Sequence, residues 1–184
     1  MKIISGKLRG RNLTGPNNDL IRPTSNRAKE MIFNTLNSLL IKRKTNYNNL
    51  TIIDFFCGIG SLGIEAISRG SQKVFFLDNS IEAINLCKKN CENHNILKFS
   101  EFLHMDIINS KYQRPISFDI FFCDPPYMKY SLDTILNKIK RFLKSGSLGV
   151  IELPIQQNNI NLSGYDLLKT KTISKSKFLF VEKK

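Results

Sequence analysis

The glycine-rich segment of this chain reads Asp54-Phe55-Phe56-Cys57-Gly58-Ile59-Gly60-Ser61-Leu62-Gly63. It follows a short apolar run, opens a helical pattern and contains the spacing G-x-G-x-x-G. In a βαβ unit this spacing is typical of a crevice for a nucleotide cofactor, because the glycines allow a tight turn beside the ligand. An acid, Asp78, ends the next apolar run, where the ribose-binding acid of such a crevice is expected. The segment therefore predicts a cofactor site in an α/β fold.

Around this segment, short β-rich runs alternate with helical patterns. The runs are Leu50 to Phe56, Ser61 to Arg69, Lys73 to Asp78, Ser80 to Asn93, Phe99 to Met105, Phe118 to Asp124, Ser131 to Lys144, Ser147 to Leu153, Tyr165 to Ile173 and Lys177 to Glu182. The alternation indicates a parallel sheet covered by helices, and the last two runs predict a closing antiparallel hairpin. We expect Ser80 and Ser131 to cap helix starts, and Gly70 and Gly146 to follow helix ends.

The N-terminal part of the chain has a different pattern. Residues 2–13 mix short apolar stretches with glycines and cations, which is typical of a basic β-hairpin. Apolar residues from Ala28 to Leu40 then form a helical stripe, and Thr24 or Ser25 can cap its start.

Length and hydropathy indicate one buried core. The chain has 184 residues, of which 41% are hydrophobic, so we expect a single domain over residues 1–184. Within it we place a hairpin extension at residues 1–20 and a Rossmann-like core at residues 21–184. The apolar runs are far shorter than the roughly 20 residues that a membrane-spanning helix needs, and no secretory signal is visible at the start. These features predict a cytoplasmic protein.

The charge balance points to an anionic partner. Lysine and arginine number 28 against 15 acidic residues, which gives a formal net charge of +13 and favours nucleic acid. A basic proteome or a codon bias towards lysine and asparagine is the competing explanation. The candidate phosphate contacts are Lys7, Arg9, Arg11, Arg22, Arg27 and Lys29, although any one of them could equally be a solvated surface charge.

The four cysteines lie within apolar or helical patterns and are expected to be reduced thiols. They are Cys57, Cys87, Cys91 and Cys123, without a C-x-x-C pair. Cys87, Cys91 and His94 could share a helical face as metal ligands, but ordinary helix positions are the simpler explanation. We predict no metal site.

Asp54 discriminates between two classes of cofactor. A carboxyl group beside the glycine loop would repel the pyrophosphate of a dinucleotide, whereas S-adenosylmethionine carries no phosphate and presents an ammonium and a sulfonium group. Asp78 is expected to accept hydrogen bonds from the ribose hydroxyls, with Asn79 near the adenine. Asp106, after the third predicted strand, could accept the adenine amino group, or could instead cap a helix.

The run Asp124-Pro125-Pro126-Tyr127 ends the fourth predicted strand, on the side of the sheet where ligands bind. To methylate an exocyclic amino group, a site must hold the nitrogen out of conjugation with the base ring. Asp124 and the Pro125 carbonyl can each accept one amino hydrogen, and the prolines fix the direction of that carbonyl. Tyr127 can stack on an extruded base. A simple strand-ending turn is the alternative interpretation.

Three segments together resemble the RsmD-type methyltransferases, bacterial enzymes that methylate N2 of one guanine in small-subunit rRNA. They are Arg22-Pro23-Thr24-Ser25-Asn26-Arg27 through Phe33-Asn34, the glycine segment extended through Ile64-Glu65-Ala66-Ile67-Ser68-Arg69-Gly70, and Asp124-Pro125-Pro126-Tyr127. The resemblance covers nearly the whole chain. It departs from the family at Cys57-Gly58-Ile59-Gly60, where the family usually has Ala-Gly-Ser-Gly, and at Asn26, where it usually has Asp.

The resemblance implies a Rossmann-like class I methyltransferase fold, with a seven-stranded and mostly parallel sheet. It implies that S-adenosylmethionine binds the loop from Asp54 to Gly60, including Phe56 and Gly58, together with Asp78. It also implies that the target guanine lies at residues 124–127. The expected partner is 16S rRNA, the small ribosomal subunit or its assembly intermediate, and we expect a monomer with no membrane partner.

Three other functions remain open at this stage. An adenine-N6 or cytosine-N4 methyltransferase would share Asp-Pro-Pro-Tyr and the glycine loop, although DNA enzymes of that type generally carry a further recognition domain. A non-catalytic RNA-binding assembly factor could use the same fold, but the intact acids and glycines count against it. A nicotinamide-dependent dehydrogenase is disfavoured by Asp54 and by the lack of a second domain.

Overall fold

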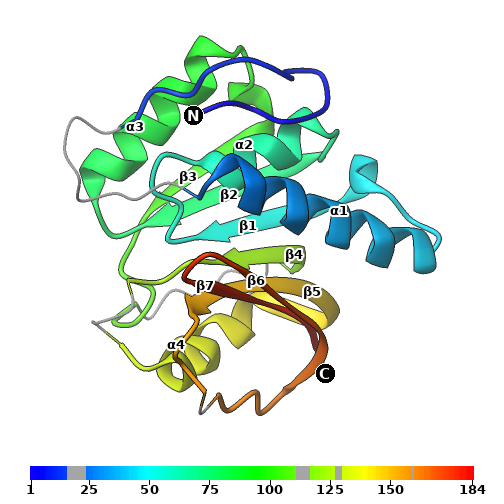
Figure 1. Ribbon diagram of the computed structural model, residues 1–184. Coiled ribbons are helices and arrows are strands. Elements are labelled where there is room, and N and C mark those ends of the chain that lie inside the picture. Colours follow the sequence, from blue (N-terminus) through cyan, green and yellow to red (C-terminus); the bar gives the residue numbers. More distant parts are fainter. Residues whose placement is uncertain (16–23, 111–116, 127–129, 159) are drawn as a thin grey trace.

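The computed structural model describes residues 1–15, 24–110, 117–126, 130–158 and 160–184. Within these ranges the strands form one seven-stranded sheet flanked by helices (Figure 1). The strands are β1 (Thr51–Phe55), β2 (Lys73–Asp78), β3 (Ser100–His104), β4 (Phe118–Cys123), β5 (Leu143–Pro154), β6 (Tyr165–Ile173) and β7 (Ser176–Lys183). The α-helices are α1 (Asn26–Lys42), α2 (Ser61–Ser68), α3 (Ile81–Asn93) and α4 (Leu132–Ile139), and short 3-10 helices span Tyr47–Asn49, Leu97–Phe99 and Lys140–Phe142.

The strand order is β3-β2-β1-β4-β5-β7-β6, and strands β1 to β5 are parallel to one another. β7 runs antiparallel to both β5 and β6, which confirms the predicted closing hairpin. The chain leaves β1 towards β2 on one side and returns to β4 on the other. This reversal opens a crevice at the carboxyl ends of the strands, where open α/β sheets bind their ligands.

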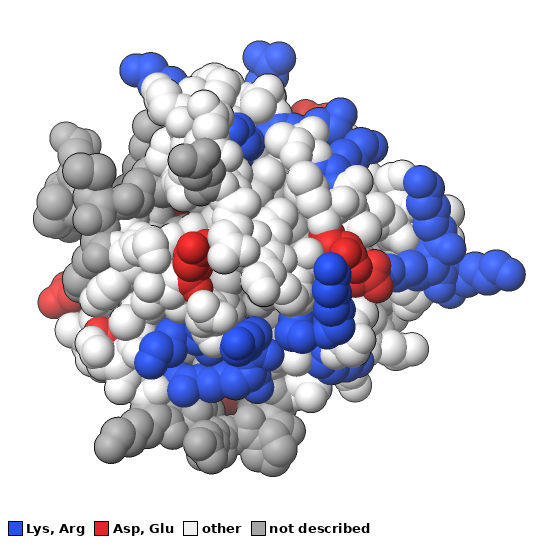
Figure 2. Space-filling model, turned by 90° about the horizontal axis from the view of Figure 1, so that it is seen from below, with Lys and Arg blue, Asp and Glu red and all other residues white. Residues whose placement is uncertain are grey.

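The cation excess lies on the surface. On the face shown in Figure 2, lysine and arginine side chains form several separate groups and outnumber the acidic side chains. Among the described residues, no helix is both long and apolar enough to cross a membrane.

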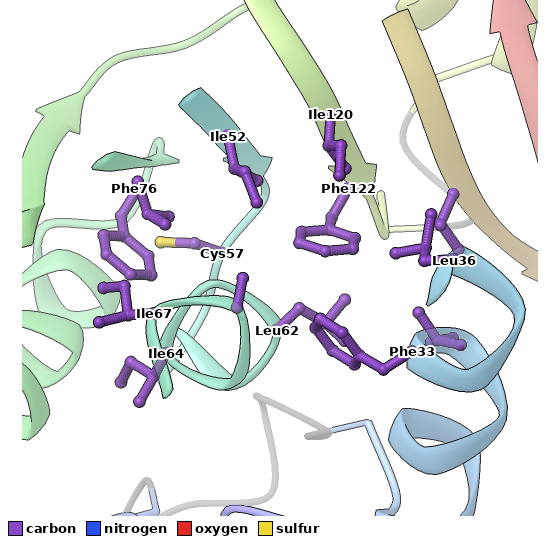
Figure 3. Packing of buried hydrophobic residues seen from close by; sticks show 14 of the residues in the cluster. Phe33, Leu36, Ile52, Cys57, Leu62, Ile64, Ile67, Phe76, Ile120 and Phe122 are labelled. Atoms are coloured by element: carbon purple, nitrogen blue, oxygen red, sulfur yellow. The ribbon is translucent and has the colours of Figure 1, made fainter. Parts of the chain in front are cut away.

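Helices cover both faces of the sheet and divide the core into two clusters. On one face, α1 to α3 pack against the sheet, and the aromatic rings of Phe33 and Phe122 lie 5.7 Å apart. Figure 3 shows Phe33 of α1 and Leu62 of α2 facing Phe122 of β4. On the other face, α4 inserts Ile135 and Ile139 into a second cluster. The sheet is therefore buried on both sides, which explains the continuous apolar runs of its central strands.

The N-terminal segment is packed onto this first face, but not as the predicted two-stranded hairpin. Its ends pair antiparallel through a single bridge between Lys2 and Asn12, and the residues between them form turns. Ile3, Leu8 and Leu13 are buried in the same core cluster as α1 and α2. Most of their backbone bonds stay within the segment, such as Ile3 N–H to the carbonyl of Arg11 and Leu13 N–H to the carbonyl of Met1, while Leu8 N–H bonds to the hydroxyl of Ser68 in α2.

A buried carboxyl group, Glu65 of α2, holds this segment in place. Glu65 is 0% exposed and accepts hydrogen bonds from the backbone N–H of Ile4 at 2.7 Å and of Ser5 at 3.0 Å. The guanidinium of Arg69, one helical turn later, donates to the same carboxyl at 2.9 Å. Lys29 of α1 donates its ammonium to the carbonyl of Lys2. The N-terminal segment thus joins α1 to α2 through polar bonds that are shielded from water.

The predicted helix ends are mostly correct. The hydroxyls of Ser25, Ser80 and Ser131 accept backbone N–H bonds at the starts of α1, α3 and α4. Gly70 follows α2 with φ of 108°, in the left-handed region. Gly146 was expected after a helix reaching Lys144. It instead lies inside β5 with φ of 82°, because α4 ends at Ile139 and the chain enters the strand at Leu143.

We expect Glu65→Ala to lower the free energy of unfolding by about 3 kcal/mol, because it leaves two half-buried N–H groups and a guanidinium without their acceptor. Urea denaturation measures this loss. Glu101→Ala is the control, since Glu101 pairs with Lys73 at the surface, and should cost less than about 1 kcal/mol. Equal losses in the two variants would contradict the structural role of Glu65.

Candidate active site

A cavity of about 590 Å³ opens at the carboxyl ends of the parallel strands, within the usual size range of small-molecule sites. Strands β1, β2, β4 and β5 contribute their ends to it, α1 contributes its first turn, and the β6–β7 turn closes one side. The polar and loop residues that line it include Thr24, Ser25, Asp54, Gly58, Asp78, Asn79, Asp124, Pro125, Pro126, Glu152, Ser174 and Ser176. The fold therefore brings the predicted cofactor loop and the predicted catalytic run to one cavity.

The loop between β1 and α2 is folded around two carboxyl groups. Asp54 accepts the backbone N–H of Gly63 at 2.9 Å, and Asp78 accepts that of Gly58 at 2.9 Å. Gly60 has φ of 81°, and a Cβ there would lie 2.4 Å from the sulfur of Cys87, so the turn requires glycine. Gly60 shapes the loop but is not among the residues that line the cavity, whereas Phe56 and Gly58 are.

Asp78 lines the cavity, and its contact with the ribose stays a prediction. One of its oxygens accepts from Gly58, and the other accepts from the backbone N–H of Ser80 at 3.0 Å. A carboxylate has about four acceptor positions, so these bonds orient Asp78 and leave capacity for two hydroxyl donors. Asn79 also lines the cavity, and its carbonyl oxygen lies 3.1 Å from the ring nitrogen Nε2 of His104.

The electrostatics of the cavity suit a cationic ligand. Asp54 is 3% exposed, and burial is the main reason why its pKa is raised to about 8 from the usual 3.8. The Gly63 N–H bond opposes this rise in pKa, and the nearby carboxyl groups of Asp124 and Asp78 add to it. A sulfonium or ammonium group bound here would favour ionised Asp54, whereas a pyrophosphate would meet three carboxyl groups. The carboxyl groups around the cavity therefore fit S-adenosylmethionine.

The catalytic run continues directly from β4. Asp124, Pro125 and Pro126 line the cavity, as the sequence predicted, while Tyr127 lies outside the described residues. Cys123 pairs in register with Ile151 of β5. Asp124 is the first residue after β4, and Glu152 follows Ile151 within β5, so both come directly after this pair of strand residues.

Glu152 was not identified from the sequence, yet it belongs to the cavity lining. One of its oxygens accepts a hydrogen bond from the hydroxyl of Ser176 at 2.6 Å. Within the described part of the chain, its other oxygen, Oε2, is buried with no hydrogen-bond partner. A buried acceptor without a donor is costly, so a donor from a molecule in the cavity would stabilise it. The signal in the sequence that could have identified Glu152 is its acidic side chain inside the apolar run Ser147 to Leu153.

Known proteins are similar to this chain over nearly its whole length. The family model described as Conserved hypothetical protein 95 matches residues 1–182. Ribosomal RNA small subunit methyltransferase D of Haemophilus influenzae is 32% identical over 181 residues, covering 94% of this chain and 88% of that protein. Its namesake from Buchnera aphidicola is 32% identical over 172 residues, covering 92% and 86%. The chain belongs to the RsmD family.

Solved structures confirm the fold of this RsmD family member. The yhhF protein of Escherichia coli aligns with a TM-score of 0.83 at 21% identity, covering 100% of this chain and 97% of that one. A methylase structure from Haemophilus influenzae aligns with a TM-score of 0.78 at 27% identity, covering 99% and 97%. The predicted class I methyltransferase fold and its cofactor, S-adenosylmethionine, are confirmed at the level of the family.

The two departures from the RsmD pattern, at Ile59 and Asn26, lie beside the cofactor loop and at the start of α1. Ile59 is buried and lines the cavity, so it occupies space beside the cofactor loop. Asn26 is the first residue of α1, and its side-chain oxygen accepts a long 3.5 Å bond from the backbone N–H of Lys2. Asn26 therefore contacts the N-terminal segment through a neutral acceptor.

Asp106 does not line the cavity. Its carboxyl group accepts the backbone N–H of Ile108 at 2.8 Å and the side-chain amide of Asn109 at 2.8 Å. These bonds cap the turn that follows β3. Asp106 thus caps a turn, whereas the alternative considered from the sequence was a helix cap, and its contact with the adenine stays a prediction.

The predicted phosphate contacts separate into different regions. Lys29 is 0% exposed and bonded to the carbonyl of Lys2, so its assignment to RNA is wrong. The backbone N–H of Lys7 bonds to the carbonyl of Ser68 at the far end of α2, whereas Ser61 at the other end lines the cavity. Lys7, with its neighbours Arg9 and Arg11, is therefore not beside the cavity. Arg27 is exposed on the first turn of α1, and Arg22 lies outside the described residues.

The four cysteines are buried thiols. Cys57 lines the cavity, and burial raises the pKa of its thiol to about 11. His94, the third residue considered as a metal ligand, contacts the N-terminal segment instead: its ring nitrogen lies 3.1 Å from the carbonyl oxygen of Asn12. Among the described residues, no group of three His, Cys, Asp or Glu side chains could hold a metal ion.

The raised pKa of Asp54 predicts a pH-dependent stability. Between about pH 4 and pH 8 the folded state retains a proton that the unfolded state loses, so stability falls as pH rises through this window. Asp54→Asn removes this penalty while keeping an acceptor for Gly63. Its gain in Tm over the natural protein should be larger at pH 9 than at pH 5, by at least about 2–4 °C or ~1 kcal/mol.

Thermal denaturation of the ligand-free protein at the two pH values measures this difference. Asp133→Asn, at an exposed position of α4, controls for removal of a solvated carboxyl group. A gain for Asp54→Asn that is the same at both pH values, or larger at pH 5, would show that Asp54 is not held protonated by burial.

Proposed function

We propose that this protein transfers a methyl group from S-adenosylmethionine to the exocyclic N2 of one guanine in small-subunit rRNA, a site of the guanine-966 type. The curated relatives named Ribosomal RNA small subunit methyltransferase D support the rRNA substrate. The buried Oε2 of Glu152, which has no hydrogen-bond partner among the described residues of the cavity, carries the choice of guanine.

Asp124 and Pro125 hold the amino group in a reactive orientation. The carboxyl group of Asp124 and the carbonyl of Pro125 accept one amino hydrogen each, which turns the nitrogen lone pair out of the plane of the base. When bound, S-adenosylmethionine would supply a methyl group activated by its sulfonium; the neutral thioether leaves, and the methylated amino group loses one proton to water. The chain needs no covalent nucleophile, because positioning and electrostatics lower the barrier.

Glu152 favours guanine over the other amino bases. Beside its amino group, guanine presents the N1–H donor, whereas adenine presents the acceptor N1 and cytosine the acceptor N3. The buried Oε2 of Glu152 needs a donor, and it lies on the strand next to Asp124. Guanine would fill this need, and adenine or cytosine would place a lone pair against a carboxyl oxygen.

The function is tested by methyl transfer from labelled S-adenosylmethionine to small ribosomal subunits, and to free rRNA, from a strain lacking this protein. Nucleoside analysis should yield N2-methylguanosine at one position. N6-methyladenosine or N4-methylcytidine would establish the alternative amino-base activity. Cofactor binding without any methylated nucleoside would establish the non-catalytic assembly factor.

We expect Asp124→Ala to reduce turnover by at least about a hundredfold, because the amino group loses its charged acceptor. Affinity for S-adenosylmethionine, measured by calorimetry, should change little. Asp133→Ala in α4 serves as the control and should keep the natural rate. A near-natural rate in Asp124→Ala would remove Asp124 from the reaction.

We expect Glu152→Gln to lower kcat/KM for the guanine substrate by at least about a hundredfold, because the amide can place a donor against N1–H. The amide oxygen can still accept from Ser176, so the fold should be retained. Glu182→Gln is the control, since Glu182 forms a surface ion pair with Arg43. Full activity in Glu152→Gln would show that the orphan oxygen does not read the base.

A further inference from the structure

A groove of about 560 Å³ runs between α1 and β6, apart from the active-site cavity. From α1 its lining comprises Arg27, Glu30, Met31, Asn34, Thr35 and Ser38. These positions recur every three or four residues and so form one stripe along the helix. The opposite stripe of α1, including Ile32, Phe33 and Leu36, is buried in the core. The solvent-facing side of α1 therefore forms one wall of the groove, and the opposite side of this helix packs in the core.

The second wall of the groove is β6, which is an edge strand of the sheet. Lys169, Lys171 and Ile173 alternate along β6 and therefore point to one side, and they line the groove together with Thr172. Lys169 and Lys171 are exposed. Lysines on an edge strand protect it against pairing with another strand, which is the simplest alternative role for them.

The groove is rich in cations that are not neutralised by the described residues around them. Arg27, Lys169 and Lys171 form no salt bridge or side-chain hydrogen bond with any part of the chain that the structure describes. Glu30 is the one acid among the described residues of the lining, so the groove carries a net positive charge. Asn34 and Ser38 add neutral donors along the same wall. Cations combined with amide and hydroxyl donors are the groups that contact nucleic-acid phosphates.

The groove leads directly to the active-site cavity. Ile173 lines both hollows, and Thr24, Ser25 and Ala28, which flank Arg27, line the cavity. A nucleotide whose base enters the cavity must be taken out of its stack, so its neighbours leave the cavity as a single strand. The groove provides a charged path for that strand at the point where it leaves.

We infer that the groove between α1 and β6 binds the RNA backbone next to the target nucleotide, with Arg27, Lys169 and Lys171 as phosphate contacts. The inference rests on the proposed function in one respect, namely that RNA is the substrate. It moves the main RNA contact from the N-terminal cations Arg9 and Arg11, which lie beyond the far end of α2, to a surface that adjoins the cavity.

The test compares three double variants that each remove two positive charges. Lys169→Gln with Lys171→Gln changes the groove, Arg9→Gln with Arg11→Gln changes the N-terminal segment, and Lys88→Gln with Lys89→Gln changes exposed positions on α3, which packs near the other edge of the sheet. Binding of fluorescein-labelled single-stranded RNA is measured by anisotropy over a range of salt concentrations. Thermal denaturation and S-adenosylmethionine affinity verify that each variant is folded.

The groove variant should bind RNA about tenfold more weakly than the α3 variant, with a salt slope smaller by roughly 0.7 for each phosphate that the protein no longer neutralises. Its affinity for S-adenosylmethionine should be unchanged. Groove and α3 variants with the same RNA affinity and slope would overturn the inference, as would a loss confined to the N-terminal variant.

These measurements are independent of the proposed methylation. Loss of RNA binding in the groove variant, together with no methylated nucleoside, would support the groove and refute the proposed function. Methylation of guanine, together with natural RNA binding in the groove variant, would support the proposed function and refute the role of the groove.

Discussion

The parallel pairing of β1 with β2 on one side and with β4 on the other is the constraint on which the site depends. Parallel neighbours end at the same edge, so Asp54, Asp78 and Asp124 are brought together from positions that are far apart in the chain. The reversal of strand order leaves the space between these strand ends uncovered by a crossover helix. The cavity is thus a consequence of topology, and the loops after each strand only shape its walls.

Three carboxyl groups around one cavity have an energetic cost in the ligand-free protein. Burial and mutual repulsion raise the pKa of Asp54 to about 8, so the protein keeps a proton there that water would otherwise remove. The positive charge of a cationic cofactor would offset both effects, because it attracts the carboxylates. The same arrangement that destabilises the empty cavity at high pH therefore selects a sulfonium ligand over a phosphate.

The N-terminal segment and the groove show that the sequence alone does not indicate which cations lie near the cavity. The cations of the segment accompany apolar residues that pack on α1 and α2, and the buried pair of Glu65 and Arg69 secures this packing. Its charges are consequently carried to the far end of α2. In contrast, Lys169 and Lys171 lie late in the chain, but the antiparallel pairing of β6 and β7 places them beside α1 and the cavity mouth.

Local patterns were sufficient for most of the architecture. The alternating runs, the glycine spacing and the caps at Ser25, Ser80 and Ser131 predicted the parallel core, the cofactor loop and the helix starts, because each depends on residues within one turn or one βαβ unit. Glu152 and the turn at Ser174 to Ser176 could not be assigned in this way. Their place in the cavity follows from the register of β5 against β4 and β7, which no short segment specifies. The burial of Lys29 and the distance of Arg9 and Arg11 from the site also depend on such long-range packing. Sequence pattern thus determined which chemistry the chain can support, while pairing between distant strands and helices decided which side chains share the cavity.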